Sequence, residues 1–129
     1  MGKKLTITDL IAQKDKLKKK KQRQMTLRIE SLDAEIVIQE PSRAFALEAL
    51  EMAQSDTDSD KADAHVVYHS VVEPNLKDPE LQKKFGCAEP IDIVDMIFRP
   101  GEVSAISGHA LELAGFGKSV KKVDHELKN

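Results

Sequence analysis

The sequence has no tryptophan, one tyrosine and one cysteine among its 129 residues. A single cysteine excludes an intrachain disulfide, so the cysteine content gives no argument for export. No apolar run approaches the roughly 20 residues that a membrane-spanning helix needs, and the first residues lack the apolar segment of a secretory signal. We therefore expect a cytoplasmic protein without a membrane partner, whose core consists mainly of Leu, Ile, Val and Ala.

The net charge of −2 conceals two oppositely charged parts. Residues 1–23 contain nine Lys or Arg and two Asp, which gives +7, whereas the remaining eleven Lys or Arg and twenty Asp or Glu give −9. Within positions 14–23, seven of the ten residues are basic: Lys14, Lys16, Lys18, Lys19, Lys20, Lys21 and Arg23. This pattern predicts a basic arm that contacts phosphates, an acidic partner or the acidic remainder of the chain.

The arm also carries a helix signal. Thr6 or Thr8 is suited to cap a helix with Asp9 in its first turn, and a short apolar stripe follows at Ile7, Leu10, Ile11 and Leu17. Like charges four positions apart oppose a helix, so we expect residues 14–23 to fray unless a partner neutralises them. Residues 25–29 and 35–39 then alternate between apolar and polar, with a turn at 31–33, which predicts a β-hairpin.

Helices are expected over the rest of the chain. The first is capped by Ser42, runs to about Gln54 and has its apolar side at Phe45, Leu47, Leu50 and Met52. The second starts at Ser59 or Asp60 and ends at Glu73-Pro74. The third begins at Asp78-Pro79 and stops at Gly86. The fourth opens at Pro90 and includes Phe98; after a break at Arg99-Pro100-Gly101, the last runs from Glu102 to Ala114.

These elements predict an α+β fold that is predominantly α, namely a compact helical domain with a short N-terminal β-hairpin. We divide the chain into a basic helical arm at 1–23, a single domain at 24–117 and a flexible charged tail at 118–129.

One acidic segment resembles a calcium loop. Asp56, Asp58 and Asp60 match positions 1, 3 and 5 of an EF-hand loop, but Lys61 replaces the required glycine and Val67 replaces the bidentate glutamate. We therefore interpret these residues as a solvated loop that caps helices.

The remaining candidate catalytic and metal-binding residues lack partners in the sequence. His65 and His69 have the spacing of two metal ligands on one helix, but no third ligand follows at a motif spacing, so we favour two surface histidines. Cys87 precedes a helix start without a nucleophile pattern around it, and we favour a buried or idle cysteine. We expect no catalytic residue, no bound metal and no cofactor.

The basic run supports two kinds of partner. It holds no aromatic residue on which a nucleic-acid base stacks, and no nucleic-acid-binding motif accompanies it, so we expect a protein partner. A nucleic-acid-associated regulatory protein that uses the basic N-terminal arm is the alternative, and it predicts strongly salt-dependent binding.

Five short pieces, in a fixed order, carry a family resemblance. They are Val67-Tyr68, the run Pro74-Asn75-Leu76-Lys77-Asp78-Pro79-Glu80-Leu81, then Ile91-Asp92-Ile93-Val94, Pro100-Gly101-Glu102-Val103 and Leu113-Ala114-Gly115-Phe116. With them the chain resembles the XkdN-like tail assembly chaperones of long-tailed phages and prophages of Gram-positive bacteria. The layout of residues 5–66, a basic leader followed by a hairpin and a Pro41-Ser42 helix start, is similar to that family as well.

The resemblance implies a non-enzymatic morphogenesis factor. It would bind the tape measure protein in the host bacterial cytoplasm before tail tube subunits polymerise, with the tail tube protein as a further partner, and would be absent from the mature virion. A longer frameshifted product and a homo-oligomer both stay open. We hypothesise that Phe98, Leu111 and Phe116, which lie beside helix breaks, line the client groove; placement of all three in the core is the favoured alternative.

Overall fold

The computed structural model describes residues 3–117 and 120–123 of the chain, so residues 118–119 and 124–129 of the expected tail lie outside the described residues. The fold is mixed α+β and mostly helical, as the sequence predicted. In chain order the elements are α1 (Ile7–Ala12), α2 (Lys14–Lys18), β1 (Gln24–Ile29), β2 (Ala34–Gln39), α3 (Arg43–Ala53), α4 (Ala62–Ser70), β3 (Val71–Glu73), α5 (Pro79–Phe85), α6 (Asp92–Ile97) and α7 (Pro100–Leu113).

The predicted hairpin is confirmed by the pairing of β1 with β2. The two strands are antiparallel, with Met25 opposite Ile38 and Leu27 opposite Ile36. Their connection contains a short 3₁₀ turn over Glu30–Leu32, and Asp33 adopts a left-handed conformation with φ of 49°. Isoleucines of both strands are buried, which places one face of the hairpin on the core.

The sheet has a third strand where the sequence predicted the end of a helix. Helix α4 ends at Ser70, and Val71–Glu73 pairs antiparallel with β2, so the strand order is β1-β2-β3. Two consecutive β-branched residues favour an extended backbone, and the residue before Pro74 avoids the helical region. The expected helix to Glu73 was therefore wrong by three residues. The hairpin is also not the first element, because α1 and α2 precede it.

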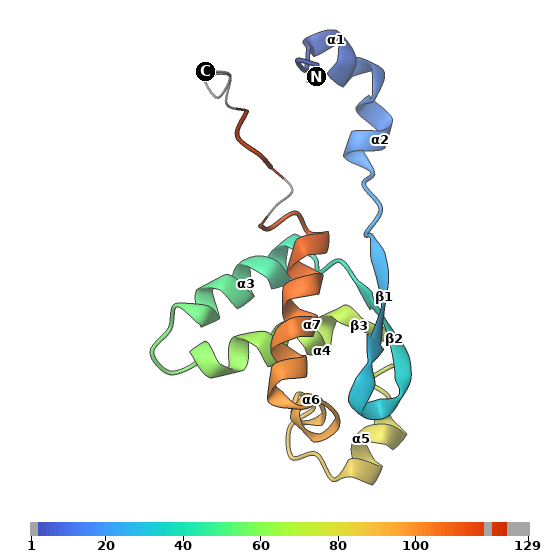
Figure 1. Cartoon of the computed structure of the whole chain (residues 1–129), viewed down its shortest axis with the longest axis vertical. Helices are drawn as coiled ribbons and strands as arrows, with labels where there is room; N and C mark the ends of the chain where they lie inside the picture. The colour runs from blue at the N-terminus through green and yellow to red at the C-terminus, as the bar shows by residue number, and fades with distance from the viewer. Residues whose placement is uncertain (1–2, 118–119, 124–129) are drawn as a thin grey trace.

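Helix α4 lies at the centre of the body. It contacts α3, α6, α7 and β3, and its buried residues are Ala62, Ala64, Val66, Val67 and Ser70. Helix α7 lies against α4 and also contacts both strands of the hairpin, so it connects the helical layer to the sheet (Figure 1). The common core comprises Ile29, Ile36, Ile38, Ala49, Ala64, Val66, Val67, Val71, Leu76, Ile93, Val94, Phe98, Val103, Ile106 and Ala110.

Most of the expected helix ends are confirmed by their capping contacts. Ser42 Oγ accepts a hydrogen bond from the Phe45 N–H at 3.2 Å, and Asp78 Oδ1 accepts one from the Leu81 N–H at 3.0 Å. Gly86 ends α5 with φ of 66°, in the left-handed region that glycine adopts without strain. The start of α4 is an exception: a 3₁₀ turn over Ser59–Lys61 leads into it, and Lys61 occupies the N-cap position.

Helix α7 begins two residues earlier than the sequence predicted. The expected break at Arg99-Pro100-Gly101 is its first turn, because proline is favoured at the first helical position. Glu102 Oε1 accepts a hydrogen bond from the Arg99 N–H at 2.8 Å. A hydrogen bond from the Ser31 side chain, and then the one from the Arg99 backbone, lower the pKa of Glu102. This carboxylate therefore joins the start of α7 to the hairpin turn.

The buried side of α3 differs from the predicted one. Ala46 and Ala49 are buried at 3% exposure each, whereas Phe45 and Leu47 remain 37% and 50% exposed. Alanines on the contact side allow α3 to approach α4 closely, while the larger side chains stay partly exposed at the edge of this contact. The ring of Phe45 stacks on His69 of α4, with 3.9 Å between ring centroids.

His69 is surrounded by groups that disfavour its charged form. Burial is the largest cause, followed by the charge of Lys77, whose Nζ lies 3.3 Å from His69 Nδ1, and by His65; together they lower the pKa of His69 from 6.5 to about 4. Because the pKa is depressed in the folded state, the unfolded chain binds a proton first as the pH falls. The stability linked to His69 is therefore complete above pH 6.5 and is lost as the pH falls towards 4.

We predict that His69→Gln will flatten the pH dependence of stability. Between pH 7 and pH 5 the wild-type chain should lose roughly 1 kcal/mol through this residue, a figure reduced for solvent screening. Urea unfolding at both pH values measures the loss. An equal loss in wild type and variant would contradict the prediction, and His109→Gln, in an exposed histidine of α7, is the control.

Candidate partner-binding site

The arm starts with a short helix that its own side chains stabilise. Thr6 Oγ1 accepts a hydrogen bond from the Asp9 N–H at 3.1 Å, and Asp9 Oδ2 accepts one from the Thr6 N–H at 3.3 Å. A hydrogen bond from the Thr6 side chain, and then the one from the Thr6 backbone N–H, lower the pKa of the Asp9 carboxyl. This reciprocal capping confirms Thr6 as the helix start, and the basic charges interrupt helical structure only after Lys18.

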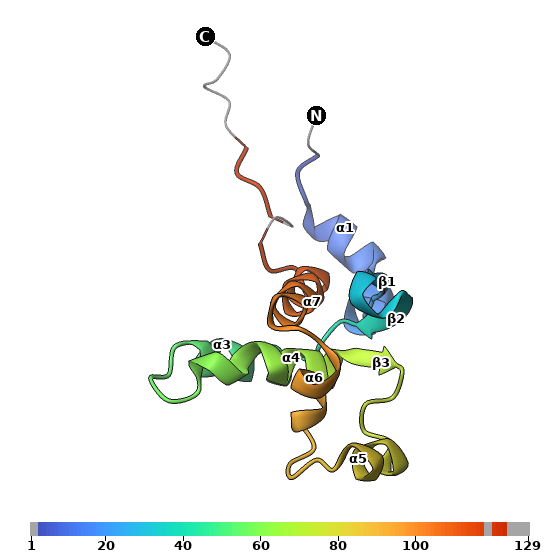
Figure 2. The same ribbon diagram turned by 60° about the horizontal axis from the view of Figure 1, so that its bottom comes forward.

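The large apolar side chains of the described part of the arm, residues 3–23, are all exposed to solvent. The exposed fractions range from 38% for Leu17 to 76% for Ile7. Figure 1 shows α1 at the end of the arm that is far from α3, α4 and the other helices of the body; in the view of Figure 2 the arm overlaps β1. The arm therefore presents apolar and basic side chains to solvent: its apolar part is Leu5, Ile7, Leu10, Ile11 and Leu17, and exposed lysines follow on α2.

The predicted basic residues occupy the half of the arm that is nearer to β1, residues 14–23. Lys14, Lys16 and Lys18 lie on α2, and Lys19–Lys21 continue in an irregular segment towards β1. All six lysines are exposed. Arg23 is exposed as well, but it is engaged with the body.

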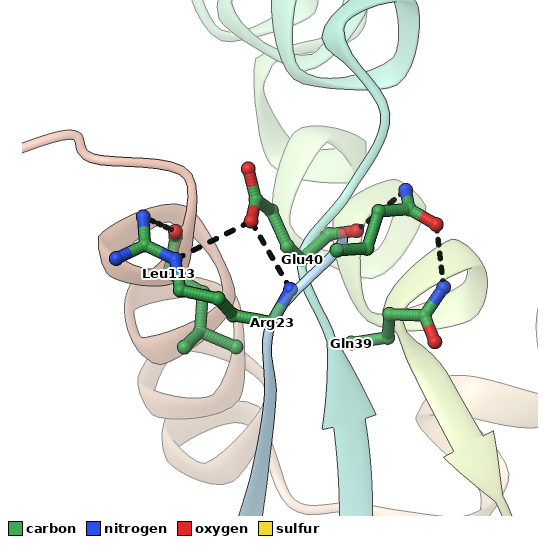
Figure 3. A network of polar contacts seen from close by, with 5 residues as sticks. Arg23, Gln39, Glu40 and Leu113 are labelled. Atoms are coloured by element: carbon green, nitrogen blue, oxygen red, sulfur yellow. Dashed lines mark hydrogen bonds and ion pairs between the residues drawn. The ribbon is translucent and has the colours of Figure 1, made fainter. Parts of the chain in front are cut away.

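A polar network fixes the base of the arm to the body (Figure 3). The backbone N–H of Arg23 donates to Glu40 Oε1 at 3.2 Å, and its guanidinium donates to the same oxygen and to the carbonyl of Leu113 at the end of α7. Gln22 Nε2 donates to the Glu40 carbonyl at 3.0 Å, while its Oε1 accepts from Gln39 at 2.6 Å. Arg23 thus connects the arm, the hairpin and α7.

Two adjoining depressions flank this network. The first, of about 490 Å³, lies beside the arm and is lined by Lys16, Leu17, Lys19, Lys20, Lys21, Arg23 and Glu40. The second, of about 460 Å³, is lined by Lys20, Glu40, Pro41, Arg43, Ala46, Leu47, Ala114 and Phe116. They share Lys20 and Glu40, so they form one surface, which we call the arm-base groove.

The groove combines an apolar floor with a basic rim. Five lysines and arginines of the arm, together with Arg43 of α3, lie around it. Among the described residues that line it, Glu40 is the one carboxylate, and it is paired with Arg23 at 3.5 Å. The groove therefore carries excess positive charge that no lining residue neutralises.

Phe116 reaches the groove through the end of α7. Gly115 adopts φ of 94°, and the Phe116 N–H donates to the Leu111 carbonyl at 3.1 Å, which turns the chain away from the helix axis. The phenylalanine is left 37% exposed.

The other two residues of the client-groove hypothesis lie elsewhere. Phe98 is buried at 3% exposure and Leu111 is partly buried against the core. Phe98 borders a separate depression with Leu32 and Met96, so the structure does not bring the three predicted residues together. Leu47, Pro41 and Arg43 line the arm-base groove instead. Sequence reasoning placed Leu47 on the buried side of its helix, and its apolar character is the only signal that could have pointed to a binding surface.

The candidate residues His65 and Cys87 make contacts within the body. His65 Nε2 lies 2.7 Å from Glu48 Oε1 across the α3–α4 contact, and Cys87 Sγ lies 3.9 Å from Met96 Sδ. Within residues 3–117 and 120–123, no three His, Cys, Asp or Glu side chains assemble into a metal-binding group. No helix in the same residues is long and apolar enough to cross a membrane.

We predict that Arg23→Met will loosen the base of the arm. Losing the contacts to Glu40 and to the Leu113 carbonyl should cost roughly 1 kcal/mol and should speed tryptic cleavage at Lys19–Lys21 severalfold. Thermal unfolding and timed proteolysis measure both effects. Arg28→Met is the matched control, because Arg28 pairs only with Glu30 and Asp33 of its own turn among the described residues. Cleavage at the wild-type rate would show that Arg23 does not hold the arm.

Comparisons with known proteins agree with the fold and identify the family. A crystal structure described as that of the protein yqbn, a Northeast Structural Genomics Consortium target, is similar, with a TM-score of 0.58 and 16% sequence identity, covering 77% of this chain and 90% of that chain. At that identity the similarity concerns the fold alone. No curated protein matches the chain.

The family model of the phage XkdN-like tail assembly chaperone protein matches residues 7–128. The match includes the arm from α1 onward, the hairpin and every helix of the body. It confirms the resemblance that five short pieces of sequence indicated. The chain belongs to the family of phage XkdN-like tail assembly chaperones.

Proposed function

We propose that the chain binds the phage tape measure protein during tail assembly and holds it soluble, without catalysing a reaction. The observation that carries this proposal is the family match over residues 7–128. A protein that assembles tails acts on tail proteins, and the tape measure protein is the long one that needs protection before the tube forms around it. The tail tube protein is the second candidate partner. The proposed place of action is the host cytoplasm, and the chain would leave before the virion is complete.

The geometry supports a binding role. Helices of six and five residues are too short to be stable alone in water, and the arm leaves its apolar side chains in solvent. Such a surface gains most when another protein covers it. His65 and Glu48 face each other across the contact between α3 and α4, and Glu102 caps the start of α7 through the Arg99 N–H.

Co-expression with the tape measure gene product of the same phage tests this function. We predict that the two proteins will co-purify and that the soluble fraction of the tape measure protein will rise in proportion to the amount of chaperone. Proportionality distinguishes a stoichiometric binder from a catalyst. The tail tube protein, expressed in the same way, tests the second partner. Unchanged solubility together with no co-purification would refute the proposal.

A further inference from the structure

We propose that the arm-base groove binds one amphipathic helix of the partner, and that the polar side of this helix is acidic. The inference rests on the proposed function for the identity of the partner, but its chemistry follows from the groove alone.

The floor requires apolar side chains from the partner. Leu47 is 50% exposed and Phe116 is 37% exposed, and both line the second depression with Pro41 and Ala46. Leu17, at 38% exposure, lines the first. Apolar positions on one side of a helix, spaced three and four residues apart, fit such a row of contacts. Each depression has the size of pockets that enclose ligand-sized groups, about 300–1,000 Å³.

The rim selects the charge of the partner. Lys16, Lys19, Lys20, Lys21 and Arg43 surround the floor, while Glu40 is already paired with Arg23. Carboxylates on either side of an apolar stripe would meet these cations, and an amphipathic helix with lysines there would be repelled.

The arm extends the same chemistry beyond the groove. Ile7, Leu10 and Ile11 are exposed at helical spacing on α1, which precedes Leu17 in the chain. The basic residues Lys14, Lys16 and Lys18 lie on α2 beside Leu17. A partner helix that continues past the groove therefore meets more apolar and basic side chains of the same kind.

The same observations disfavour two other occupants. A nucleic acid would use the lysines but would leave the apolar floor uncovered, and Phe116 is the one aromatic side chain among the described groove residues. A second copy placed symmetrically on this groove would bring two basic rims together, which is repulsive.

Synthetic helical peptides of about 18 residues test the preference. One peptide carries leucines at positions i, i+3, i+4 and i+7 with glutamates between them; a second replaces the glutamates by lysines; a third keeps the glutamates but shuffles the leucines. We expect the full chain to bind the first with a Kd at least about tenfold lower than either other peptide. Equal affinity for the first two, or for the first and third, would overturn the proposal.

Substitutions in the groove locate the binding. Leu47→Asp, Phe116→Ser and Lys20→Glu should each weaken binding of the glutamate peptide by about tenfold or more. Leu32→Asp is the matched control, because Leu32 is 46% exposed at the hairpin turn, at the opposite end of the strands from the arm. Circular dichroism shows that each variant is folded. Loss with Lys20→Glu but none with Leu47→Asp or Phe116→Ser would show binding by charge alone and would overturn the proposal.

Two further measurements separate the alternatives. If a single-stranded DNA oligonucleotide binds more tightly than the peptide and Leu47→Asp leaves that binding unchanged, the groove serves nucleic acid and the proposal fails. If Leu47→Asp converts an oligomer to a monomer in sedimentation, the groove serves self-association and the proposal also fails.

Failure of this inference is distinguishable from failure of the proposed function. If the Leu47→Asp and Phe116→Ser variants co-purify with the tape measure protein as the wild type does, the groove assignment is wrong while the function stands. If the glutamate peptide binds in the groove but the tape measure protein never co-purifies, the groove assignment stands and the function is wrong.

Discussion

Close packing of small side chains around α4 is the constraint on which the body depends. Helix α4 contacts α3, α6, α7 and β3, and it buries alanine, valine and serine towards them. A sequence with no tryptophan and four phenylalanines gains core stability by bringing helices close together. The close approach has a consequence for the surface: α3 turns its alanines inward, so Phe45 and Leu47 remain outside. The apolar floor of the arm-base groove is in part a result of how α3 meets α4.

The sequence predicted the elements whose signals are local. Ser42, Asp78 and Gly86 act through hydrogen bonds or dihedral angles within a few residues, so their positions marked helix ends correctly. Two features depended on distant partners and were missed. Strand β3 forms because Val71 pairs with the edge of β2. Which side of α3 is buried depends on how closely that helix packs against α4. Hydrophobicity alone predicts that the large apolar residues of α3 are buried, whereas Ala46 and Ala49 are the buried residues of that helix.

The candidate site was predicted in its charge but not in its shape. The basic run from Lys14 to Arg23 is evident in the sequence, whereas the groove joins the arm to α3 and to the end of α7. Its central contacts link Arg23 to Glu40, 17 residues away, and to Leu113, 90 residues away. Contacts between residues so far apart in the sequence cannot be predicted from a local pattern. The rule that places large apolar residues near helix breaks found Phe116, but it also selected Phe98 and Leu111, which pack against or within the core.

The surface where the arm joins the body does not share the net negative charge of the chain outside the arm. Although the chain outside the arm carries −9 against +7 for the arm, the part of the body nearest the arm contributes Arg43 to the same rim, and Glu40 there is paired with Arg23. The lysines of the arm therefore lie near the positive charge of Arg43 where the arm joins the body. The contacts of Arg23 hold only the base of the arm in place. Ordering the helical turns of α1 and α2 costs conformational entropy, and the favourable free energy of binding a partner would offset this cost. Binding of this kind combines a wide contact with limited affinity, which suits the transient binding of a partner that we propose for this chain.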